Sequence, residues 1–379
     1  MNGQTEDLKG FQVQGIEGKT FLVTGGCGYF GSRLVELLLF NGAKNIVILD
    51  LKPIALEKIR PSLQSLYTQR VRVVSTDIRN YEQVKRCAEG SKIDVVFHIA
   101  SYGMSGAEMM NHQLTREVNI GGTENIIKLC VEYNIKSLIY TSTYNVIFGG
   151  QELVNKDETE PYFPFDKHFD EYSRSKARAE ELILRSNGIP LKNQNTLSTC
   201  ALRSAAIYGE GEERHFPRIV RYMHWGLFRC TMGRSDSLVE YVYVDNLAHA
   251  HILAAKTLSE EKSRAAGEAF FVSDQHPVNN FEFLRPLAAA LDIPYPSLAM
   301  PVWFMLIIGL IVEIFHRYVS PYYPFQPFIT RTEVFKVSVT HYFDPKKIRE
   351  ILGYRPVVDW KEGQKRLVQY WAEKEKKNN

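Results

Sequence analysis

The sequence predicts an α/β protein with a doubly wound parallel sheet, and three observations lead to this fold class. Short runs of β-branched residues alternate with longer stretches whose apolar residues recur at helical spacing. A glycine-rich turn follows the first of these runs. The composition, with 45% hydrophobic and 23% charged residues, is that of a globular protein. Short apolar strands with room for a helix between them indicate βαβ units, whose strands lie parallel.

Each predicted element follows from this alternation. The predicted strands are Thr20–Val23, Asn45–Leu49, Val71–Val74, Ile93–Phe97, Ser137–Tyr140, Thr199–Ile207, Glu240–Val244 and Ala269–Val272. The predicted helices are Phe30–Phe40, Tyr81–Glu89, Leu114–Tyr133, Asp170–Ser186 and Val244–Leu258. Gly42 follows the first helix at the place where a C-terminal glycine cap belongs.

Composition and charge exclude several classes of function. A net charge of +3, evenly spread, does not indicate nucleic-acid binding. The cysteines lie too far apart for a disulfide framework or a metal site: Cys27, Cys87, Cys130, Cys200 and Cys230. We therefore expect reduced thiols, no metal and no nucleic-acid partner. The residues before Gly18 also lack the apolar core of a signal peptide.

A glycine motif after the first strand predicts a dinucleotide site. The stretch from Thr24 to Gly31 reads TGGCGYFG, which matches G-x-G-x-x-G and also the G-x-x-G-x-x-G variant. It follows a strand and opens a helix, so glycine lets the backbone approach a pyrophosphate at the positive helix N-terminus. The residues expected to hold the dinucleotide here are Gly25, Gly28, Tyr29, Phe30 and Gly31.

Residues at the ends of the next strands predict the rest of that site. Asp50 ends the second strand, where a carboxylate bonds the adenosine ribose and repels a 2′-phosphate, so NAD is favoured over NADP. Lys52 lies close by and keeps NADP as the second choice. Asp77 and Ile78 are placed to contact the adenine ring, and the loop with Ala100 and Ser101 would run along the cofactor. Asp77 and this loop could equally serve as strand-end caps.

The pattern Tyr-x-x-x-Lys puts a phenol and an ammonium on one face of a helix, where the ammonium favours the phenolate. Position selects Tyr172 and Lys176, because their helix follows the fifth strand and that strand ends at Thr143. The crevice of a doubly wound sheet lies beyond these strand ends. Three further copies lie elsewhere and are interpreted as solvated pairs: Tyr81/Lys85, Tyr342/Lys346 and Tyr370/Lys374.

These motifs together resemble the extended short-chain dehydrogenase/reductases, whose order they follow from Thr24 to Gly209. Other stretches resemble the 3β-hydroxysteroid dehydrogenase/isomerase branch, and particularly short-chain dehydrogenase/reductase family 42E. They are Phe97–Gly106, Asn145–Gln151, Arg214–Val220, Val278–Leu287 and Phe325–Val334. The similarity spans roughly Gly18 to Trp371.

The resemblance implies an activity and a role for each residue. Tyr172 would be the general base, Lys176 a ribose ligand that activates the phenol, and Thr143 the hydroxyl that orients the substrate. Asn119, within the family's motif, would lie at the cofactor. The implied reaction is oxidation of a 3β-hydroxyl of a steroid or sterol-like lipid, with hydride passing to NAD. No residue supports an isomerase activity.

Two alternatives stay open at this point. A nucleotide-sugar epimerase could use the same scaffold, because fold does not fix function. Such an enzyme needs a polar pocket with a basic clamp, whereas apolar side chains are expected here: Tyr102, Met104, Tyr144 and Phe148. A non-catalytic NAD-binding scaffold is the second alternative, and the intact Thr143, Tyr172 and Lys176 argue against it.

An apolar segment, Leu298–Phe315, predicts contact with a membrane. Eighteen helical residues measure about 27 Å, just enough to cross a hydrocarbon core. Phe343–Tyr354 resembles the family's terminal helix, and a crossing would leave that helix on the far side of the membrane. Lys376 and Lys377 would form a dilysine signal, which only a cytosolic receptor can read. We therefore expect a monotopic or re-entrant segment, on an endoplasmic reticulum membrane, with the catalytic domain facing the cytosol. A buried helix or a lid is the alternative.

These inferences divide the chain into four regions. Residues 1–17 would be a polar N-terminal tail, and residues 18–200 the NAD-binding Rossmann domain with the catalytic residues. Residues 201–375 would be a substrate-binding part interleaved with the last strands, and residues 376–379 the dilysine-like tail. The expected partners are a small lipophilic alcohol or ketone and a membrane surface, with a homodimer as a further option.

Overall fold

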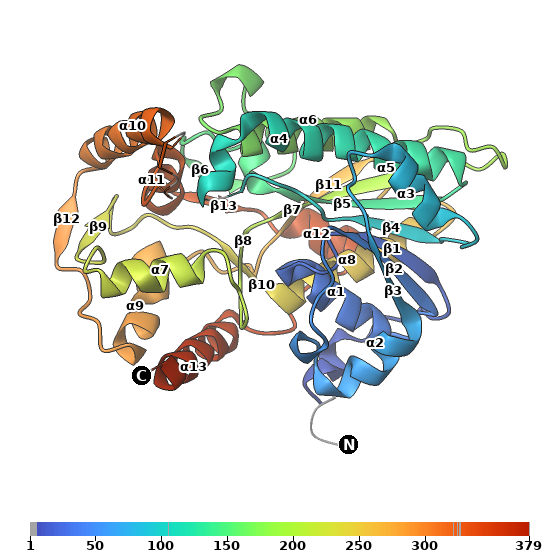
Figure 1. The fold of residues 1–379 in the computed structure, drawn as a ribbon, viewed down its shortest axis with the longest axis horizontal. Helices are drawn as coiled ribbons and strands as arrows, with labels where there is room; N and C mark the ends of the chain where they lie inside the picture. Colours follow the sequence, from blue (N-terminus) through green and yellow to red (C-terminus); the bar gives the residue numbers. More distant parts are fainter. Residues whose placement is uncertain (1–5, 105, 321, 324, 326, 379) are drawn as a thin grey trace.

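The centre of the molecule is a seven-stranded, fully parallel sheet in the order β11-β7-β5-β4-β1-β2-β3 (Figure 1). The computed structural model describes residues 6–104, 106–320, 322, 323, 325 and 327–378. The strands are β1 (Thr20–Thr24), β2 (Asn45–Asp50), β3 (Val71–Ser75), β4 (Val95–His98), β5 (Ser137–Thr143), β7 (Ser198–Ser204) and β11 (Glu268–Val272). The order reverses between β1 and β4, which confirms the doubly wound sheet and places a crevice at that point.

Helices cover both faces of this sheet (Figure 1). One face carries α1 (Tyr29–Phe40), α2 (Gln64–Arg70), α8 (Val244–Leu258) and α12 (Lys346–Leu352). The other carries α3 (Tyr81–Ala88), α4 (His112–Arg116), α5 (Gly122–Glu132) and α6 (Glu171–Arg185). The strands are apolar on both sides, so a separate hydrophobic core fills each layer. The central strands are therefore held rigidly, and their carboxyl ends make a fixed platform for a site.

Three expectations about the elements need correction. The expected polar tail is part of the fold from Glu6 onward, because Leu8, Phe11 and Ile16 are buried in the core under α1. The single strand predicted over Thr199–Ile207 divides: β7 ends at Ser204, and β8 (Ala206–Tyr208) pairs with β10 (Tyr241–Tyr243) in a separate sheet. An apolar run gives no signal for such a change of sheet.

The helix predicted over Leu114–Tyr133 contains a π-helical turn, which is the third correction. Residues Glu117–Gly121 have π-helical hydrogen bonding between α4 and α5, and the buried Asn119 lies within this turn. One extra residue in a helical turn shifts the direction of the side chains there, and such turns occur frequently at functional sites. Helical periodicity in the sequence does not reveal it.

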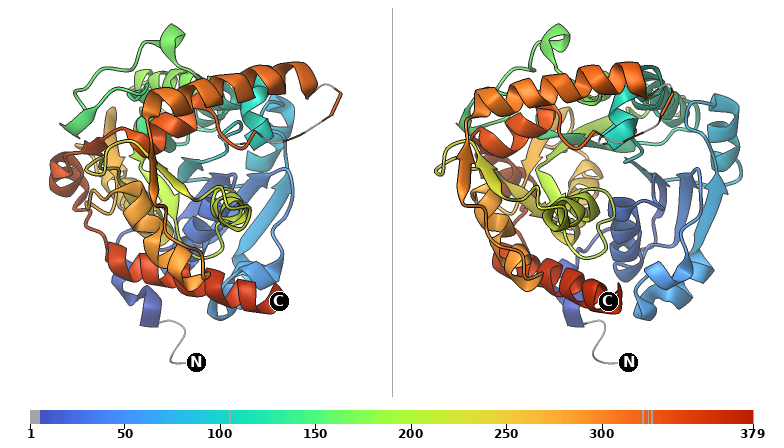
Figure 2. Two further views of the ribbon diagram at one scale, coloured as in Figure 1. Left: turned by 90° about the vertical axis from the view of Figure 1, so that its left-hand side faces the viewer. Right: turned by 60° about the vertical axis from the view of Figure 1, so that its left-hand side comes forward.

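A smaller lobe, built mainly from the C-terminal part, lies beside the sheet (Figure 2). Its helices are α7 (Phe216–His224), α9 (Asn280–Ala290), α10 (Val302–Val319), α11 (Arg331–Ser338) and α13 (Trp360–Asn378). Two pairs of short parallel strands complete it: β9 (Cys230–Met232) with β12 (Leu298–Met300), and β6 (Leu153–Lys156) with β13 (His341–Phe343). Between β13 and α13 the chain returns to the sheet, where α12 buries Ile348 and Leu352 against α8 and β11.

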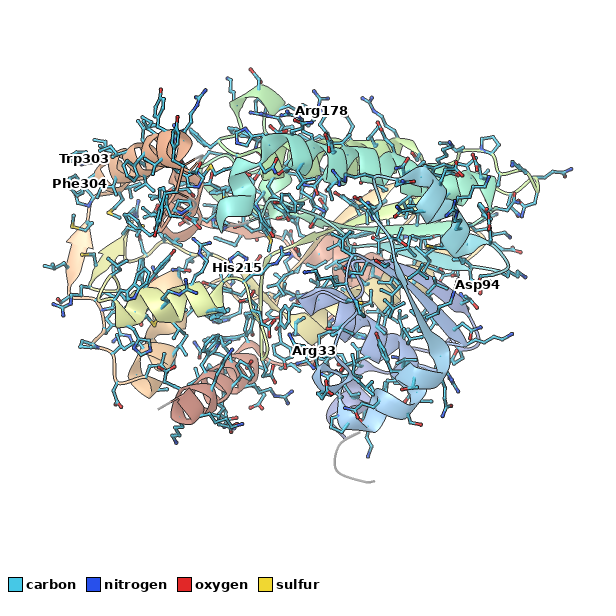
Figure 3. All side chains as sticks on the ribbon, viewed as in Figure 1. Arg33, Asp94, Arg178, His215, Trp303 and Phe304 are labelled. Atoms are coloured by element: carbon cyan, nitrogen blue, oxygen red, sulfur yellow. The ribbon has the colours of Figure 1, made fainter. Side chains whose placement is uncertain are left out.

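The apolar segment forms α10 at the edge of the molecule, preceded by the strand β12. Within the described residues it is the one helix long and apolar enough to cross a membrane, with a mean hydropathy of 1.8 and only 17% of its length buried. Gly309 and Glu313 dock it on the start of α11, and His316, on the same helical face, contacts the backbone of Phe325 before α11. The rest of its surface is exposed apolar side chains, and Trp303 and Phe304 extend from its outer end (Figure 3).

Candidate active site

The glycine loop between β1 and α1 has the geometry of an anion cradle. Gly25 has a φ of +71°, which glycine adopts at no steric cost. A Cβ on Gly31 would lie 2.1 Å from the carbonyl oxygen of Gly25, so only glycine lets α1 start this close to the turn. No described side chain caps α1, so its first backbone N–H groups remain available to an anion. These observations fit a dinucleotide pyrophosphate, as the motif predicts.

Asp50 lies at the carboxyl edge of β2, directly beside the loop. Its Oδ2 accepts a hydrogen bond from the Cys27 N–H (3.0 Å), and its Oδ1 accepts one from the Leu51 N–H (2.8 Å). Each carboxylate oxygen keeps a lone pair for a ribose hydroxyl. The carboxylate is thus positioned by the same loop that would hold the pyrophosphate.

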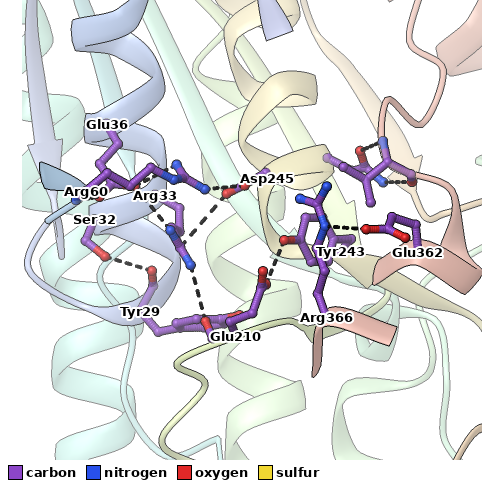
Figure 4. A network of polar contacts seen from close by, with 12 residues as sticks. Tyr29, Ser32, Arg33, Glu36, Arg60, Glu210, Tyr243, Asp245, Glu362 and Arg366 are labelled. Carbon is purple, nitrogen blue, oxygen red and sulfur yellow. Dashed lines mark hydrogen bonds and ion pairs between the residues drawn. The ribbon is translucent and has the colours of Figure 1, made fainter. Parts of the chain in front are cut away.

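Buried ion pairs lock the glycine-loop helix to its neighbours (Figure 4). The guanidinium of Arg60, from the loop after β2, contacts Glu36 on α1 at 2.7 Å and Asp245 on α8 at 2.5 Å. Arg33 on α1 contacts Glu36 at 3.4 Å. Because both carboxylates are buried, the pairing keeps their charges compensated. The Arg60 guanidinium thus contacts two carboxylates, one on α1 and one on α8.

The loops after β3 and β4 take positions that the sequence only partly predicts. Asp77 directs its carboxylate to Arg79, which contacts it at 2.7 Å, so any contact between Asp77 and adenine stays a prediction. Ile78 is buried against α5, where a Cβ on Gly122 would touch it. The Ala100 N–H donates to Thr24 Oγ1 (3.1 Å), which holds this loop against the glycine turn.

Tyr172 and Lys176 lie on the buried face of α6, next to the end of β5. Burial raises the pKa of the Tyr172 phenol well above its usual value, while the guanidinium of Arg214 and a hydrogen bond with Ser101 act in the opposite direction. Ser101, from the loop after β4, is therefore close to the phenol, as expected of a shared site. The other three Tyr-x-x-x-Lys copies belong to α3 and the C-terminal segments.

Lys176 is fully enclosed by protein. Its Nζ donates to the carbonyl oxygen of Thr141 (2.5 Å) and lies 4.1 Å from the centre of the Tyr140 ring. Burial lowers the pKa of Lys176 to about 7, and the nearby carboxylate of Glu180 opposes that shift. An anion placed beside Lys176, such as a phenolate, would favour its protonated form and raise this pKa.

Thr143 ends β5, and its side chain is buried. Its Oγ1 accepts hydrogen bonds from the N–H of Asn145 (3.3 Å) and from Asn145 Nδ2 (3.0 Å). Thr143 thus lies at the carboxyl end of β5, and α6, which carries Tyr172 and Lys176, packs against that strand. The joint action of the three residues on a substrate stays a prediction.

A buried carboxylate that the sequence analysis missed supports this group. Glu180 lies one helical turn after Lys176 and is ion-paired with Arg203 of β7 (2.7 Å). It also accepts hydrogen bonds from Tyr162 (2.9 Å) and from Ser142, the neighbour of Thr143. Tyr172, Lys176 and Glu180 are each four residues apart, and this spacing could have predicted from the sequence that Glu180 lies on the same helical face. Glu180 joins β5, α6 and β7 around the site.

Asn119 connects the same elements from the other side. Its Oδ1 accepts from the Tyr102 N–H (2.8 Å), and its Nδ2 donates to the Tyr102 carbonyl (3.0 Å) and to Ser175 Oγ (2.9 Å). All these contacts tie the β4 loop to α6, so its predicted contact with the cofactor stays a prediction. Met104, on the same loop, is half-buried.

The expected pocket residues Tyr144 and Phe148 follow β5 directly. Both are buried in a third core cluster, because the rings of His341 and Phe343 on β13 cover them. The centres of the Tyr144 and His341 rings are 4.7 Å apart. The two rings therefore pack against β13, and Phe148 also lines a small cavity, so their contact with a substrate stays a prediction. Their sequence position after β5 does not reveal that β13, about two hundred residues later, returns to cover them.

Comparison with known proteins agrees with this geometry. The family described as 3-beta hydroxysteroid dehydrogenase/isomerase matches residues 22–302. The chain belongs to this family. It is 49% identical to short-chain dehydrogenase/reductase family 42E member 1 of Danio rerio, over 90% of this chain and 87% of that protein. It is 36% identical to 3beta-hydroxysteroid-dehydrogenase/decarboxylase isoform 1 of Arabidopsis thaliana, over 92% of this chain and 78% of that protein.

Family membership makes the chain a short-chain dehydrogenase/reductase, and its strand order is that of a Rossmann-like sheet. Among solved structures, the epimerase Mth375 of Methanothermobacter thermautotrophicus gives a TM-score of 0.70 at 19% identity, covering 99% of this chain and 98% of that chain. The UDP-glucose 4-epimerase of Thermus thermophilus, in complex with NAD, gives 0.66 at 23%, covering 93% and 98%. At these identities the likeness shows the shared fold.

Proposed function

We propose that this protein is an NAD-dependent dehydrogenase that oxidises the 3β-hydroxyl of a steroid or sterol-like lipid to the ketone. The arrangement that supports the proposal is Thr143 at the end of β5, with Tyr172 and Lys176 on the buried face of α6 and an uncapped glycine-loop helix. Lys176 also donates a hydrogen bond to the β5 carbonyl of Thr141. Membership of the 3β-hydroxysteroid dehydrogenase family supports the substrate class. The position of Asp50 and the engagement of Arg60 in ion pairs support NAD over NADP.

The side chains divide the reaction between them. The Thr143 hydroxyl orients the substrate oxygen, and the phenolate of Tyr172 takes the proton from the substrate hydroxyl. Lys176 stabilises that phenolate through its positive charge. Bound NAD would supply the hydride acceptor for the hydrogen on the alcohol carbon. Proton and hydride then leave the same alcohol, and the ketone remains.

A substrate panel tests the proposal directly. Purified protein is assayed with 3β-hydroxysteroids and sterols, 3α-hydroxysteroids as stereochemical controls, and UDP-glucose, each with NAD and with NADP. We expect NADH formation with a 3β-hydroxyl substrate, and a loss of two or more orders of magnitude in Tyr172→Phe with NAD binding intact. Tyr81→Phe is the matched control, since that tyrosine belongs to a distant copy of the motif.

The same panel distinguishes the alternatives. Conversion of UDP-glucose to UDP-galactose without net NADH would instead support an epimerase. NAD binding without turnover of any alcohol would support a non-catalytic scaffold. Near wild-type turnover in Tyr172→Phe would overturn the assignment of the base.

We also propose that α10 holds the enzyme on the cytosolic face of the endoplasmic reticulum without crossing the membrane. Gly309 packs directly on the backbone of Thr330 and Arg331, and Glu313 forms an ion pair with Arg331 at 2.8 Å. A crossing would pull this face away from α11 and carry a carboxylate into hydrocarbon. A helix that lies in one leaflet keeps these contacts and buries its exposed apolar side. Carbonate extraction and a C-terminal glycosylation tag test this: retained protein with an unglycosylated tail is expected.

A further inference from the structure

The hydroxyl of Thr143 is constrained by a neighbour. Thr143 Oγ1 accepts two hydrogen bonds from Asn145, one from the backbone N–H and one from Nδ2. A hydroxyl oxygen has two acceptor lone pairs and one hydrogen. Since both lone pairs are occupied by Asn145, the Thr143 hydrogen can only point away from that residue. Thr143 is thereby fixed as a donor.

The other end of the Asn145 amide has a distinct environment. Asn145 is buried, and its Oδ1 has no hydrogen-bond partner among the described residues. The same holds for Nε2 of the buried His168. Both residues line a small cavity of about 10 Å³ next to the start of α6. A cavity of this size, with polar groups in its wall, suits a single water molecule.

The imidazole of His168 fits such a site as a neutral ring. Burial lowers the pKa of His168 to about 4, with the Asp170 carboxylate opposing the shift. A neutral imidazole offers one donor and one acceptor nitrogen. A water in the cavity would donate to Asn145 Oδ1, and the amide would then direct Nδ2 toward Thr143.

We propose that Asn145 is a positioning residue that orients the Thr143 hydroxyl as a hydrogen-bond donor to the substrate oxygen, held in this orientation by one water in the cavity shared with His168. This inference rests on the proposed dehydrogenase function, in which Thr143 contacts the substrate. Asn145 itself touches neither substrate nor cofactor in this assignment. Asn145 would affect the reaction only by orienting the Thr143 hydroxyl.

A double-mutant cycle measures the coupling between Asn145 and Thr143. Asn145→Ala and Asn145→Asp are made in the wild-type protein and in Thr143→Val, and kcat, KM and the NADH affinity are measured. We expect Asn145→Ala to lower kcat about tenfold in the wild-type background and less than twofold in Thr143→Val. NADH fluorescence titration should give an unchanged Kd. A merely structural role of Asn145 would lower kcat equally in both backgrounds.

The aspartate variant separates orientation from packing. Its carboxylate has almost the shape of the amide but only accepts hydrogen bonds, so it would turn the Thr143 hydrogen away from the substrate. We expect kcat to fall at least as far as in Asn145→Ala, even if the alanine variant folds poorly. Gln151→Ala is the control, because Gln151 holds the same loop through Gly149 and Ile147 without touching Thr143. Its kcat should change less than about twofold.

The outcomes separate two kinds of failure. A wild-type protein that turns over no alcohol overturns the proposed function, and this inference with it. An active wild type whose Asn145 variants lose kcat equally with and without Thr143, or lose none, overturns this inference alone. In a crystal structure, a water within hydrogen-bonding distance of Asn145 Oδ1 supports the orientation. An Oδ1 that accepts from Thr143 instead overturns it.

Discussion

Thr332, on the helix that supports α10, donates a hydrogen bond of 3.1 Å to Asp170, the residue that caps the catalytic helix α6. Asp170 Oδ1 accepts from the Ser173 N–H (2.7 Å), so one carboxylate serves both elements. The N-terminal end of α6 lies immediately before Tyr172. The apolar edge of the molecule and the proposed general base are therefore connected through a single side chain.

Loss of this cap should affect turnover as well as stability. Asp170→Ala removes the N-cap and frees the first turn of α6, so we expect a loss of about 1 kcal/mol in stability and a fall in kcat of about tenfold. Thermal melting and steady-state kinetics measure the two effects. Asn80→Ala is the matched control, since Asn80 caps α3 in the same way, far from Tyr172. A similar fall in kcat in both variants would contradict the link.

The sheet was predictable because each strand is a short apolar run followed by a distinct turn or helix signal. The predicted runs correspond to β1, β2 and β4, which the structure pairs as parallel neighbours. The smaller lobe was not predictable in this way, because its sheets pair strands that are far apart in the sequence. Leu153 of β6, for example, pairs with His341 of β13. Such pairings leave no local pattern.

Cofactor choice should depend on Asp50. Asp50→Ala removes the carboxylate that would repel a 2′-phosphate, so we expect the preference for NAD to fall by about tenfold or more. The measurement is the ratio of kcat/KM with NAD to that with NADP. Asp94→Ala provides a comparison, because this carboxylate binds the Thr20 N–H at the opposite end of β1. A wild-type preference for NADP, or a ratio that Asp50→Ala leaves unchanged, would refute the assignment.

The burial of Lys176 should have a measurable cost in stability. Its pKa in the folded protein is lowered to about 7, below the value of the unfolded chain. Between these two values the unfolded chain binds a proton that the folded protein does not, so the stability of the wild type rises with pH above 7. Lys176→Met removes this dependence. Relative to the wild type, the variant should lose about 1 kcal/mol or more between about pH 7 and about pH 10.

Thermal melting at both pH values measures that difference. Lys44→Met, on the exposed surface, is the control and should keep the same difference from the wild type at each pH. Equal pH dependence in Lys176→Met and the wild type would show that Lys176 is not the group responsible. Turnover should be lost in Lys176→Met, because the phenolate then lacks its cation.

The candidate site was predictable wherever one helix or one strand end carries the whole signal, as for Tyr172 with Lys176. The supporting residues escaped detection because their partners come from other elements. Glu180 forms its ion pair with Arg203 on β7, and the sequence alone does not show that the two side chains are in contact. Asn145 likewise follows Thr143 closely, yet only the turn after β5 folds its amide back onto that hydroxyl.

Attachment through α10 should depend on the exposed apolar side chains of that helix. Trp303 and Ile311 are 64% and 59% exposed, and a bilayer would bury both. Full burial of one such side chain contributes about 1.5–3 kcal/mol. The double variant Trp303→Glu/Ile311→Glu should therefore bind phosphatidylcholine vesicles at least about tenfold more weakly than the wild type, by co-sedimentation.

A matched surface residue makes this test specific. Trp225, at the end of α7, is also 64% exposed but lies on a helix with charged neighbours, so Trp225→Glu should leave vesicle binding within about twofold. Turnover of a water-soluble hydroxysteroid should be unchanged in all variants, because the substituted side chains are exposed and α10 packs on α11. Equal loss of binding in the α10 and α7 variants would indicate a general loss of apolar surface. Undiminished binding of the α10 variant would place the membrane contact elsewhere on the protein.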